Sequence, residues 1–448
     1  MTESEHIRTT DNNNGSLTAN PEWIPSLQKI ADIPLSDLIA GNPSLLVFPA
    51  TIDKSEDGVG SLPVFSLHLG RRPAIVTGNI LGFIGIDSLQ LSVRSRFGKD
   101  DAGDYFLYHM LRKVFFPNVV DLQHNSRHDS ALDILPFLFP RLLHEALRQG
   151  LYKEYTVSQY NDSRVRGKID VSRHLRCNLP FVGNVAYTVR EFSYDNDITQ
   201  LVRHTIEYIR RLPYGQNILY SDCTTKQDVD TIVNVTPSYR KTDIRNVIER
   251  NAVPLAHPYF SAYKVLQRLC LMILKGQQMR NGDADKVYGI LFDGAWLWEE
   301  YVYTLIGNFG YTHPRNKVDT GRIWLFKENR YPRYPDFIKD KIILDAKYKR
   351  IAAHSISRDD LHQLISYMHI TCSDKGALVN PVGSPESKTS IINIGSLNGH
   401  GGEIAILSLK IPCGADNFEE FEDLIADEEK KFREMVDIFE SHGSSAAD

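Results

Sequence analysis

The segment spanning residues 334–348, YPDFIKDKIILDAKY, constrains the fold more than any other part of the chain. Two β-forming runs flank a short charged turn, which predicts a β-hairpin. Asp336 is then expected on the first strand and Asp345 near the end of the second. Because side chains alternate between the faces of a strand, Asp345 and Lys347 should point the same way, with Ala346 turned to the other side. Two carboxylates and one ammonium are therefore expected to converge.

Hydrolysis of a phosphodiester needs this combination. Mg²⁺ takes oxygen ligands and keeps several waters, so Asp336, Asp345 and the carbonyl of Ala346 can hold it while phosphate oxygens enter. A protonated Lys347 is not a ligand. Its candidate roles are to orient or deprotonate the attacking water and to offset charge on the phosphorane. The pattern is that of the PD-(D/E)xK nucleases, and it predicts a Mg²⁺-dependent nuclease.

The short string D/E-x-K is unspecific by itself. Glu428-Glu429-Lys430 and Glu429-Lys430-Lys431 also match it, inside a charged segment that is predicted to be a C-terminal helix. These matches have no apolar strand and no upstream Pro-Asp, whereas Asp345 follows an apolar run with Asp336 nine residues before it. For the hairpin, an exposed edge pair with solvated charges is the alternative.

A second predicted element supports the site. Residues 357–370 have apolar residues at helical spacing, and Gln363 and Tyr367 lie one turn apart. The pair resembles the Q-x-x-x-Y helix that follows the catalytic lysine in RecB-like nucleases, where it supports the site. The alternative is an ordinary surface glutamine beside a core tyrosine.

A third element lies upstream. Residues 292–309 predict a helix with Asp293 as N-cap, and this helix contains Glu299 and Glu300. At about 100° per residue, Glu299 falls nearer the apolar sector, which makes it the candidate for a further metal-binding carboxylate. The alternative is that both glutamates are solvated.

Length and composition indicate several domains. The chain has 448 residues, 42% of them hydrophobic and 24% charged, which is ordinary for a globular protein. The pattern of runs predicts a multidomain α+β protein. Its expected parts are a disordered tail (1–22), a β-rich N-terminal domain (23–125), a mostly helical middle region (126–280) and a C-terminal α/β PD-(D/E)xK nuclease domain (281–448).

Any nucleic-acid contact must be local, because the net charge is −5. The run from His313 to Phe337 holds six basic residues against three acidic ones, interleaved with aromatic residues. As a group these residues favour contact with a DNA backbone, although each one alone is better explained as solvated. The middle region has a similar cluster around Gly167, where solvated cations on a structural turn are favoured over phosphate binding. The basic residues are Arg315, Lys317, Arg322, Lys327, Arg330 and Arg333 in the first set and Arg164, Arg166 and Lys168 in the second.

Two absences bear on location and partners. Five scattered cysteines without a C-x-x-C pair indicate the reducing cytoplasm, and no leader or long apolar run predicts export or a membrane span. The chain also lacks the G-x-x-x-x-G-K-[ST] loop of nucleotide-driven motors. A translocating restriction enzyme with this chain would need its motor from another polypeptide.

The order of these features resembles the McrC family, the nuclease subunits of McrBC modified-cytosine restriction systems. The resemblance covers roughly residues 80–440. It includes the basic segment RVRGKID at 164–170, the segment FSYDND at 192–197, the helix sequence LWEEYV at 297–302, and the hairpin and helix motifs above. It implies that Asp336, Asp345 and Lys347 cleave DNA. It also implies that the N-terminal part docks onto a hexameric AAA+ GTPase, McrB, and that 5-methylcytosine is read mainly by this partner.

Three functions compete at this point. The first is a Mg²⁺-dependent DNA endonuclease subunit that acts with a McrB-like GTPase. The second is a stand-alone nuclease in DNA repair or defence. The third is a non-catalytic stimulator of a partner NTPase, against which the intact Asp336, Asp345 and Lys347 argue.

Overall fold

The computed structural model describes residues 5–42, 44–49, 59–87, 89–98, 104–115, 135–212, 215–220, 222–279, 287–314, 320–351, 354, 356–398 and 402–441. The chain divides into two compact units. Unit 1 combines Met1–Asp133 with Gln278–Asp448, and unit 2 is Ile134–Gln277. The N-terminal and C-terminal regions, expected as separate domains, therefore share one unit, and the protein is a mixed α/β chain with several sheets.

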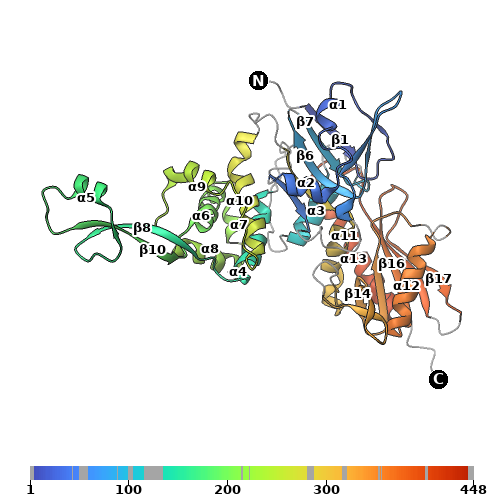
Figure 1. Ribbon diagram of the computed structural model, residues 1–448. Coiled ribbons are helices and arrows are strands. Elements are labelled where there is room, and N and C mark those ends of the chain that lie inside the picture. The colour runs from blue at the N-terminus through green and yellow to red at the C-terminus, as the bar shows by residue number, and fades with distance from the viewer. Residues whose placement is uncertain are drawn as a thin grey trace. The chain divides into compact units, whose positions relative to one another are not determined.

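The N-terminal part of unit 1 contains a five-stranded sheet with the strand order β1-β7-β6-β11-β3 (Figure 1). Its inner strands are rich in β-branched and apolar residues, which pack into one core with the flanking short helices. A small second sheet has the order β2-β5-β4. The strands are β1 (Glu5–Thr10), β2 (Leu17–Thr18), β3 (Leu45–Phe48), β4 (Phe65–His68), β5 (Ala74–Thr77), β6 (Ile80–Ile86), β7 (Leu89–Arg94) and β11 (Tyr288–Asp293), and the short helices are α1 (Ile24–Leu27), α2 (Leu35–Gly41) and η2 (Val59–Ser61).

Two predicted boundaries are wrong in this region. The expected disordered tail contains β1, which pairs in parallel with β7 from Glu5↔Leu89 to Thr10↔Arg94. Of its residues only Ile7 is buried, since β1 is an edge strand, so its composition resembles that of a loop. Strand β11, assigned by sequence to the nuclease domain, lies between β6 and β3 in the N-terminal sheet.

The C-terminal part of unit 1 contains a second five-stranded sheet, in the order β14-β15-β16-β18-β17. Its three central strands are parallel to one another, and both outer strands are antiparallel to their neighbours. Helix α12 connects β15 to β16 and packs on these two strands. The elements are β14 (Phe337–Lys339), β15 (Ile342–Ala346), α12 (Arg358–Thr371), β16 (Lys375–Val382), β17 (Ser390–Ser396), β18 (Glu403–Lys410) and α13 (Phe418–Ser441).

A layer of helices links the two sheets of unit 1. Helix α11 (Gly294–Ile306) follows β11 directly and contacts α3 (Tyr105–Phe115), α13 and β15. Asp293 caps α11 as predicted, because its Oδ1 accepts hydrogen bonds from the backbone of Ala295 at 3.0 Å and Trp296 at 3.4 Å. The short helix η5 (Gly307–Phe309) extends α11, and the hairpin strands β12 (Ile323–Phe326) and β13 (Arg330–Arg333) follow it.

Unit 2 is a helical body with a β-structured arm (Figure 1). The helices match the predicted mostly helical region, but the arm, a long antiparallel pair of β8 and β10, was expected only as an irregular stretch. Asn196 forms a capping box at the start of α6. The elements are α4 (Leu135–Arg148), β8 (Glu154–Asp162), β9 (Lys168–Ile169), α5 (Val171–Cys177), β10 (Val185–Ser193), α6 (Asp197–Ile209), α7 (Gly215–Leu219), α8 (Cys223–Val235), η4 (Lys241–Asp243), α9 (Ile244–Arg250) and α10 (Ser261–Met279).

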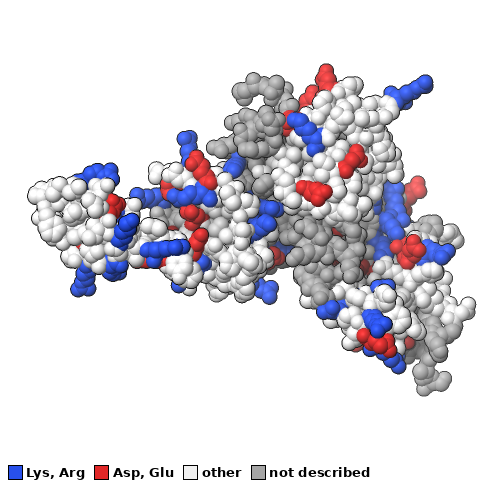
Figure 2. All heavy atoms as spheres, in the orientation of Figure 1, with Lys and Arg blue, Asp and Glu red and all other residues white. Residues whose placement is uncertain are grey.

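The basic cluster of the arm is exposed, and Figure 2 shows Lys and Arg side chains along it. The guanidinium of Arg166 lies 4.9 Å from the ring centroid of Tyr160, and its Nε donates to the hydroxyl of Tyr187 at 3.3 Å. Gly167 is required by close packing, because a Cβ there would lie 2.1 Å from the carbonyl oxygen of Thr188. Its backbone φ is not positive, so space rather than conformation demands a glycine here.

Candidate functional site

The two aspartates of the hairpin face one another. In the register of β14 and β15, Phe337 pairs with Leu344, so the preceding Asp336 lies opposite Asp345. The turn closes with Asp340 at a φ of 48°, a left-handed conformation that aspartate tolerates. Asp336 also reaches across the hairpin, because its Oδ2 accepts the backbone N–H of Ala346 at 2.6 Å. The register of the hairpin therefore fixes the relative position of the two carboxylates.

A chain of polar contacts extends from Asp345 to helix α12. The Nζ of Lys347 lies 2.6 Å from Oδ2 of Asp345 and donates to Oε1 of Gln363 at 2.8 Å. Gln363 in turn donates from Nε2 to the hydroxyl of Tyr367 at 2.9 Å. The four residues come from two separate predicted elements. The structure thus brings together Asp336, Asp345, Lys347, Gln363 and Tyr367, the five side chains that the predicted hairpin and the predicted helix contribute to the site.

Burial and mutual charge shift the pKa values of the ionisable groups in this site. Asp345 is 1% exposed, while Asp336 keeps part of its surface in solvent. Burial raises the pKa of both carboxyl groups, and the charge of Asp345 raises the pKa of Asp336 further. Burial alone would lower the pKa of Lys347, but the two carboxylates outweigh it and raise that pKa. Lys347 is therefore held as an ammonium ion, and each carboxylate gains from a nearby cation.

The donor set fits a magnesium ion. One buried oxygen, Oδ2 of Asp345, has a close ammonium ion but no hydrogen bond of acceptable geometry. Two facing carboxylates and the carbonyl of Ala346 are hard oxygen ligands, and Mg²⁺ commonly binds through one or two carboxylates plus water. Within the described residues, no group of three or more His, Cys, Asp and Glu side chains has metal-binding geometry. The site thus matches a water-rich oxygen site better than an all-protein cage.

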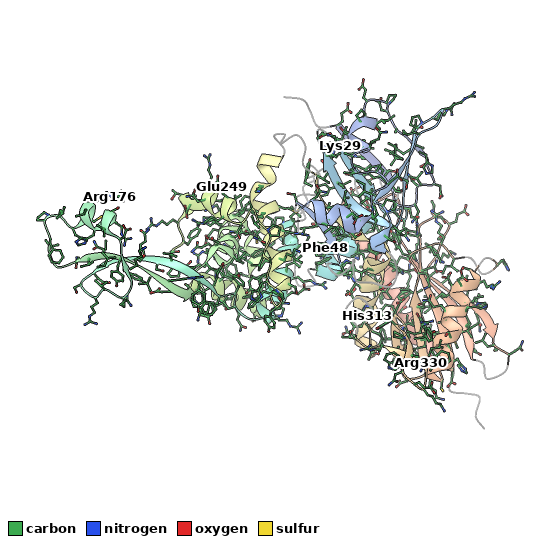
Figure 3. The ribbon with its side chains drawn as sticks, viewed as in Figure 1. Lys29, Phe48, Arg176, Glu249, His313 and Arg330 are labelled. Carbon is green, nitrogen blue, oxygen red and sulfur yellow. The ribbon has the colours of Figure 1, made fainter. Side chains whose placement is uncertain are left out.

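The prediction about the two helical glutamates is not matched by their burial. Glu300, not Glu299, is the buried one of the pair, at 7% exposed. Its Oε1 lies 3.8 Å from Nε2 of His313, and Nδ1 of His313 lies 2.7 Å from the carbonyl oxygen of Asp336 (His313 is labelled in Figure 3). Helix α11 is buried on most sides, so its apolar sector does not identify the inward face. Glu300 therefore reaches the backbone of the site through His313.

Sequence reasoning missed the residues that hold the end of β15. Tyr348, directly after Lys347, is buried, and its hydroxyl lies 2.8 Å from Oγ of Ser95. Arg96 donates a hydrogen bond to the carbonyl of Tyr348, and its guanidinium pairs with the fully buried Asp11 at 3.1 Å. All three partners belong to the N-terminal part of unit 1. No local sequence signal connects them, because more than 250 residues separate Ser95 from Tyr348.

Comparison with known proteins identifies the family. The family model of McrBC 5-methylcytosine restriction system components matches residues 75–381, well over half of the chain. The protein is thus a restriction-system component by sequence. It belongs to the McrBC family, as the McrC resemblance of its motifs implied. No curated protein gives a significant sequence match.

Two solved structures are similar to the chain. A refined half-complex from a tetradecameric assembly of Thermococcus gammatolerans McrB AAA+ hexamers with bound McrC has 15% identity and a TM-score of 0.49, covering 97% of this chain and 99% of the other. The cryo-EM structure of the Thermococcus gammatolerans McrBC complex has 15% identity and a TM-score of 0.32, with coverages of 68% and 87%. The family assignment rests on the family model, not on these likenesses.

Two further findings concern the cysteines and the length of the apolar helices. All five cysteines lie in the described part of the chain, and none of them forms a disulfide. Within the described residues, no helix combines the length and the apolar character that a membrane span requires.

Proposed function

We propose that the chain is the Mg²⁺-dependent endodeoxyribonuclease subunit of a cytoplasmic restriction system directed at 5-methylcytosine, with a PD-(D/E)xK core formed by the second sheet. The observation that carries the proposal is the opposition of Asp336 and Asp345 across the hairpin, with Lys347 held between Asp345 and Gln363. A purely structural ion pair explains this poorly, since burying two facing carboxylates is costly.

Each residue has a definite role in this proposal. Asp336, Asp345 and the carbonyl of Ala346 would hold Mg²⁺, which supplies charge stabilisation and activation of water when bound. Lys347, an ammonium ion in this environment, orients the attacking water and offsets negative charge that develops on the phosphate. Gln363 and Tyr367 fix the position of Lys347 rather than touch the phosphate. Glu300 and His313 support the backbone of Asp336.

A partner must supply movement along DNA and recognition of the modified base. The sequence has no nucleotide-binding loop of the G-x-x-x-x-G-K-[ST] type. In a similar solved structure, from Thermococcus gammatolerans, McrC is bound to McrB AAA+ hexamers. We therefore extend the proposal to a McrB-like AAA+ GTPase hexamer, which docks on the N-terminal part of this chain and controls when its site cuts.

A cleavage assay tests this function. Wild-type chain, Asp345→Asn and Lys347→Ala are incubated with methylated or unmethylated plasmid, with and without the AAA+ partner, GTP and Mg²⁺. We expect both variants to cut methylated DNA at least about 100-fold more slowly than wild type, with unchanged partner binding and GTPase stimulation. Asp340→Asn and Lys341→Ala, in the exposed turn of the same hairpin, serve as matched controls that keep wild-type rates. Full cleavage by Asp345→Asn or Lys347→Ala refutes the site.

A further inference from the structure

The hairpin of β12 and β13 directly precedes the candidate site. Its two strands pair from Ile323↔Arg333 to Phe326↔Arg330, which leaves a three-residue turn at residues 327–329. Asn329 closes the turn at a φ of 56°, as expected for the last residue of a three-residue hairpin loop. The turn is well formed, so the hairpin is a defined structure and not an irregular loop.

Two aromatic rings at the end of this hairpin are exposed. Phe326 is 49% exposed and Tyr331 is 62% exposed, and their ring centroids lie 5.7 Å apart. Tyr331 also has a φ of 57°, a left-handed conformation that is unfavourable for a large side chain. Burial does not compensate this strain, because most of the Tyr331 side chain is exposed and the ring of Phe326 beside it is half exposed. Exposed aromatic rings held in a strained conformation point to a binding role.

The base of the hairpin is anchored at the site. Ile323 packs against the core cluster that includes Leu364 and Tyr367 of α12, and β12 lies along α12. Only Tyr334 and Pro335 separate the end of β13 from Asp336. Tyr367 also belongs to the polar chain that ends at Lys347. The position of the aromatic rings relative to the two carboxylates is therefore set by short covalent and packed connections.

The charges around the rings indicate the kind of partner. Lys327 and Arg330 are exposed at the turn, and the guanidinium of Arg322 lies 5.2 Å from the ring centroid of Trp324 (Arg330 is labelled in Figure 3). Glu328 is the one acidic side chain of the hairpin. Cations beside exposed aromatic rings suit a polyanion with flat apolar surfaces, which describes nucleic acid. A two-stranded ribbon also fits the major groove of a duplex.

We propose that this hairpin is a DNA-reading wedge: Phe326 and Tyr331 pack against bases of the duplex beside the cleaved bond, while Lys327 and Arg330 contact its phosphates. This inference rests on the proposed nuclease function and goes beyond it, because it assigns contacts with bases to the nuclease subunit itself. The wedge sets the distance between the bases that it touches and the phosphate at Asp336 and Asp345.

Photo-crosslinking tests the wedge directly. The full chain carrying Lys347→Ala, which keeps DNA intact, is irradiated with duplexes that contain 5-iododeoxyuridine at successive positions, and the crosslinked peptides are identified by mass spectrometry. We expect crosslinks at Phe326 or Tyr331 at one narrow range of positions. Phe326→Ala with Tyr331→Ala should remove these crosslinks and weaken duplex binding at least about fivefold. Tyr259→Ala removes another exposed tyrosine, 66% exposed, as a control that changes neither result.

A second variant separates strain from binding. Tyr331→Gly removes the ring and suits the positive φ, so its melting temperature should not fall below that of the background chain. Its duplex binding should weaken, as in the double variant of Phe326 and Tyr331. Crosslinks that map only to other residues, wild-type affinity in the double variant, or no duplex binding by the background chain each overturn the wedge. The two proposals can fail separately. Crosslinking to the hairpin does not require DNA cleavage, and loss of cleavage in Lys347→Ala does not require contacts between the hairpin and the bases.

Discussion

Replacing Glu429 by Gln probes a buried charge that sequence patterns confuse with the catalytic motif. Glu429 begins another D/E-x-K string of the chain, but it lies in α13 and is 2% exposed. Its Oε1 lies 2.8 Å from Nε2 of His109 and accepts from the hydroxyl of Tyr301 at 2.8 Å, while its Oε2 accepts from Nζ of Lys113 at 2.9 Å. The carboxylate therefore joins α13 to α3 and α11.

The structure gives a magnitude for this change. Burial would raise the pKa of Glu429, but its hydrogen bonds and charge pairing with His109 and Lys113 lower it from 4.5 to about 2. That difference corresponds to about 3 kcal/mol of folding free energy. Because the pKa is lowered, this stability is fully present above pH 4.5 and is lost as the pH falls towards 2. Glu429→Gln should therefore lower the free energy of unfolding by about 3 kcal/mol at pH 7, and by less than about half as much at pH 3.

Urea unfolding and thermal melting at the two pH values measure this effect. At pH 7 the loss corresponds to roughly 3–5 °C in the melting temperature. Glu434→Gln makes the same substitution at an exposed position of the same helix and should change stability by less than about 0.5 kcal/mol. The reasoning is refuted if Glu429→Gln is no less stable than Glu434→Gln at pH 7, or if its loss is equal at both pH values. In folded protein, Glu429→Gln should retain DNA cleavage, which separates this string from the site.

Further predictions concern the site, its support and its partner. At pH 8 and with a chelator present, Asp336→Asn should raise the melting temperature. The reason is that burial and the charge of Asp345 raise the pKa of Asp336, which costs stability above pH 3.8, about 1.4 kcal/mol for each unit by which the pKa is raised. The gain in stability should shrink towards pH 4 and be absent in Asp340→Asn. Added Mg²⁺ should stabilise wild type and not Asp336→Asn in the same melting assay. Arg96→Ala leaves the buried Asp11 unpaired and should cost about 3–5 kcal/mol in urea unfolding, unlike the exposed Arg72→Ala. Purified chain alone should cut methylated plasmid poorly on gels, and robust cutting without GTP would favour a stand-alone nuclease.

The elements predicted well from sequence are those whose signals are local. The hairpin register follows from alternation along two short strands, and it places Asp336 opposite Asp345. The helix with Gln363 and Tyr367 follows from apolar spacing, and its observed bounds differ by one residue at each end from those expected. In each case the residues that specify the element lie within a few positions of one another. The PD-(D/E)xK identity of the core and the chemical roles of these residues stay predictions.

The elements that were missed depend on distant partners. Strand β1 is polar at most positions and is a strand because β7 offers a free edge, 84 residues later in register. Strand β11 joins the N-terminal sheet from far along the chain, and Gly289 permits the close approach, since a Cβ there would lie 2.3 Å from the carbonyl oxygen of Phe83. Glu300 is buried and Glu299 is not, because tertiary packing decides which glutamate faces inward on a helix that is apolar on most sides. Tertiary context overrides local pattern at all three places.

The contacts of Tyr348 show how the N-terminal part of unit 1 can influence the site. Its ring is 4% exposed and packs edge-on against Phe97 at 5.1 Å between centroids, and a Cβ on Gly294 would lie 3.0 Å from its Cε1. A side chain enclosed in this way cannot shift alone, because protein interiors are close-packed. Ser95 and Arg96, which follow β7, contact Tyr348 directly. Because Lys347 is bonded to Tyr348, a displacement of these two residues is passed to the backbone of Lys347. A partner that docks on the N-terminal part, as proposed, therefore needs no contact with the hairpin to alter the geometry on which cleavage depends.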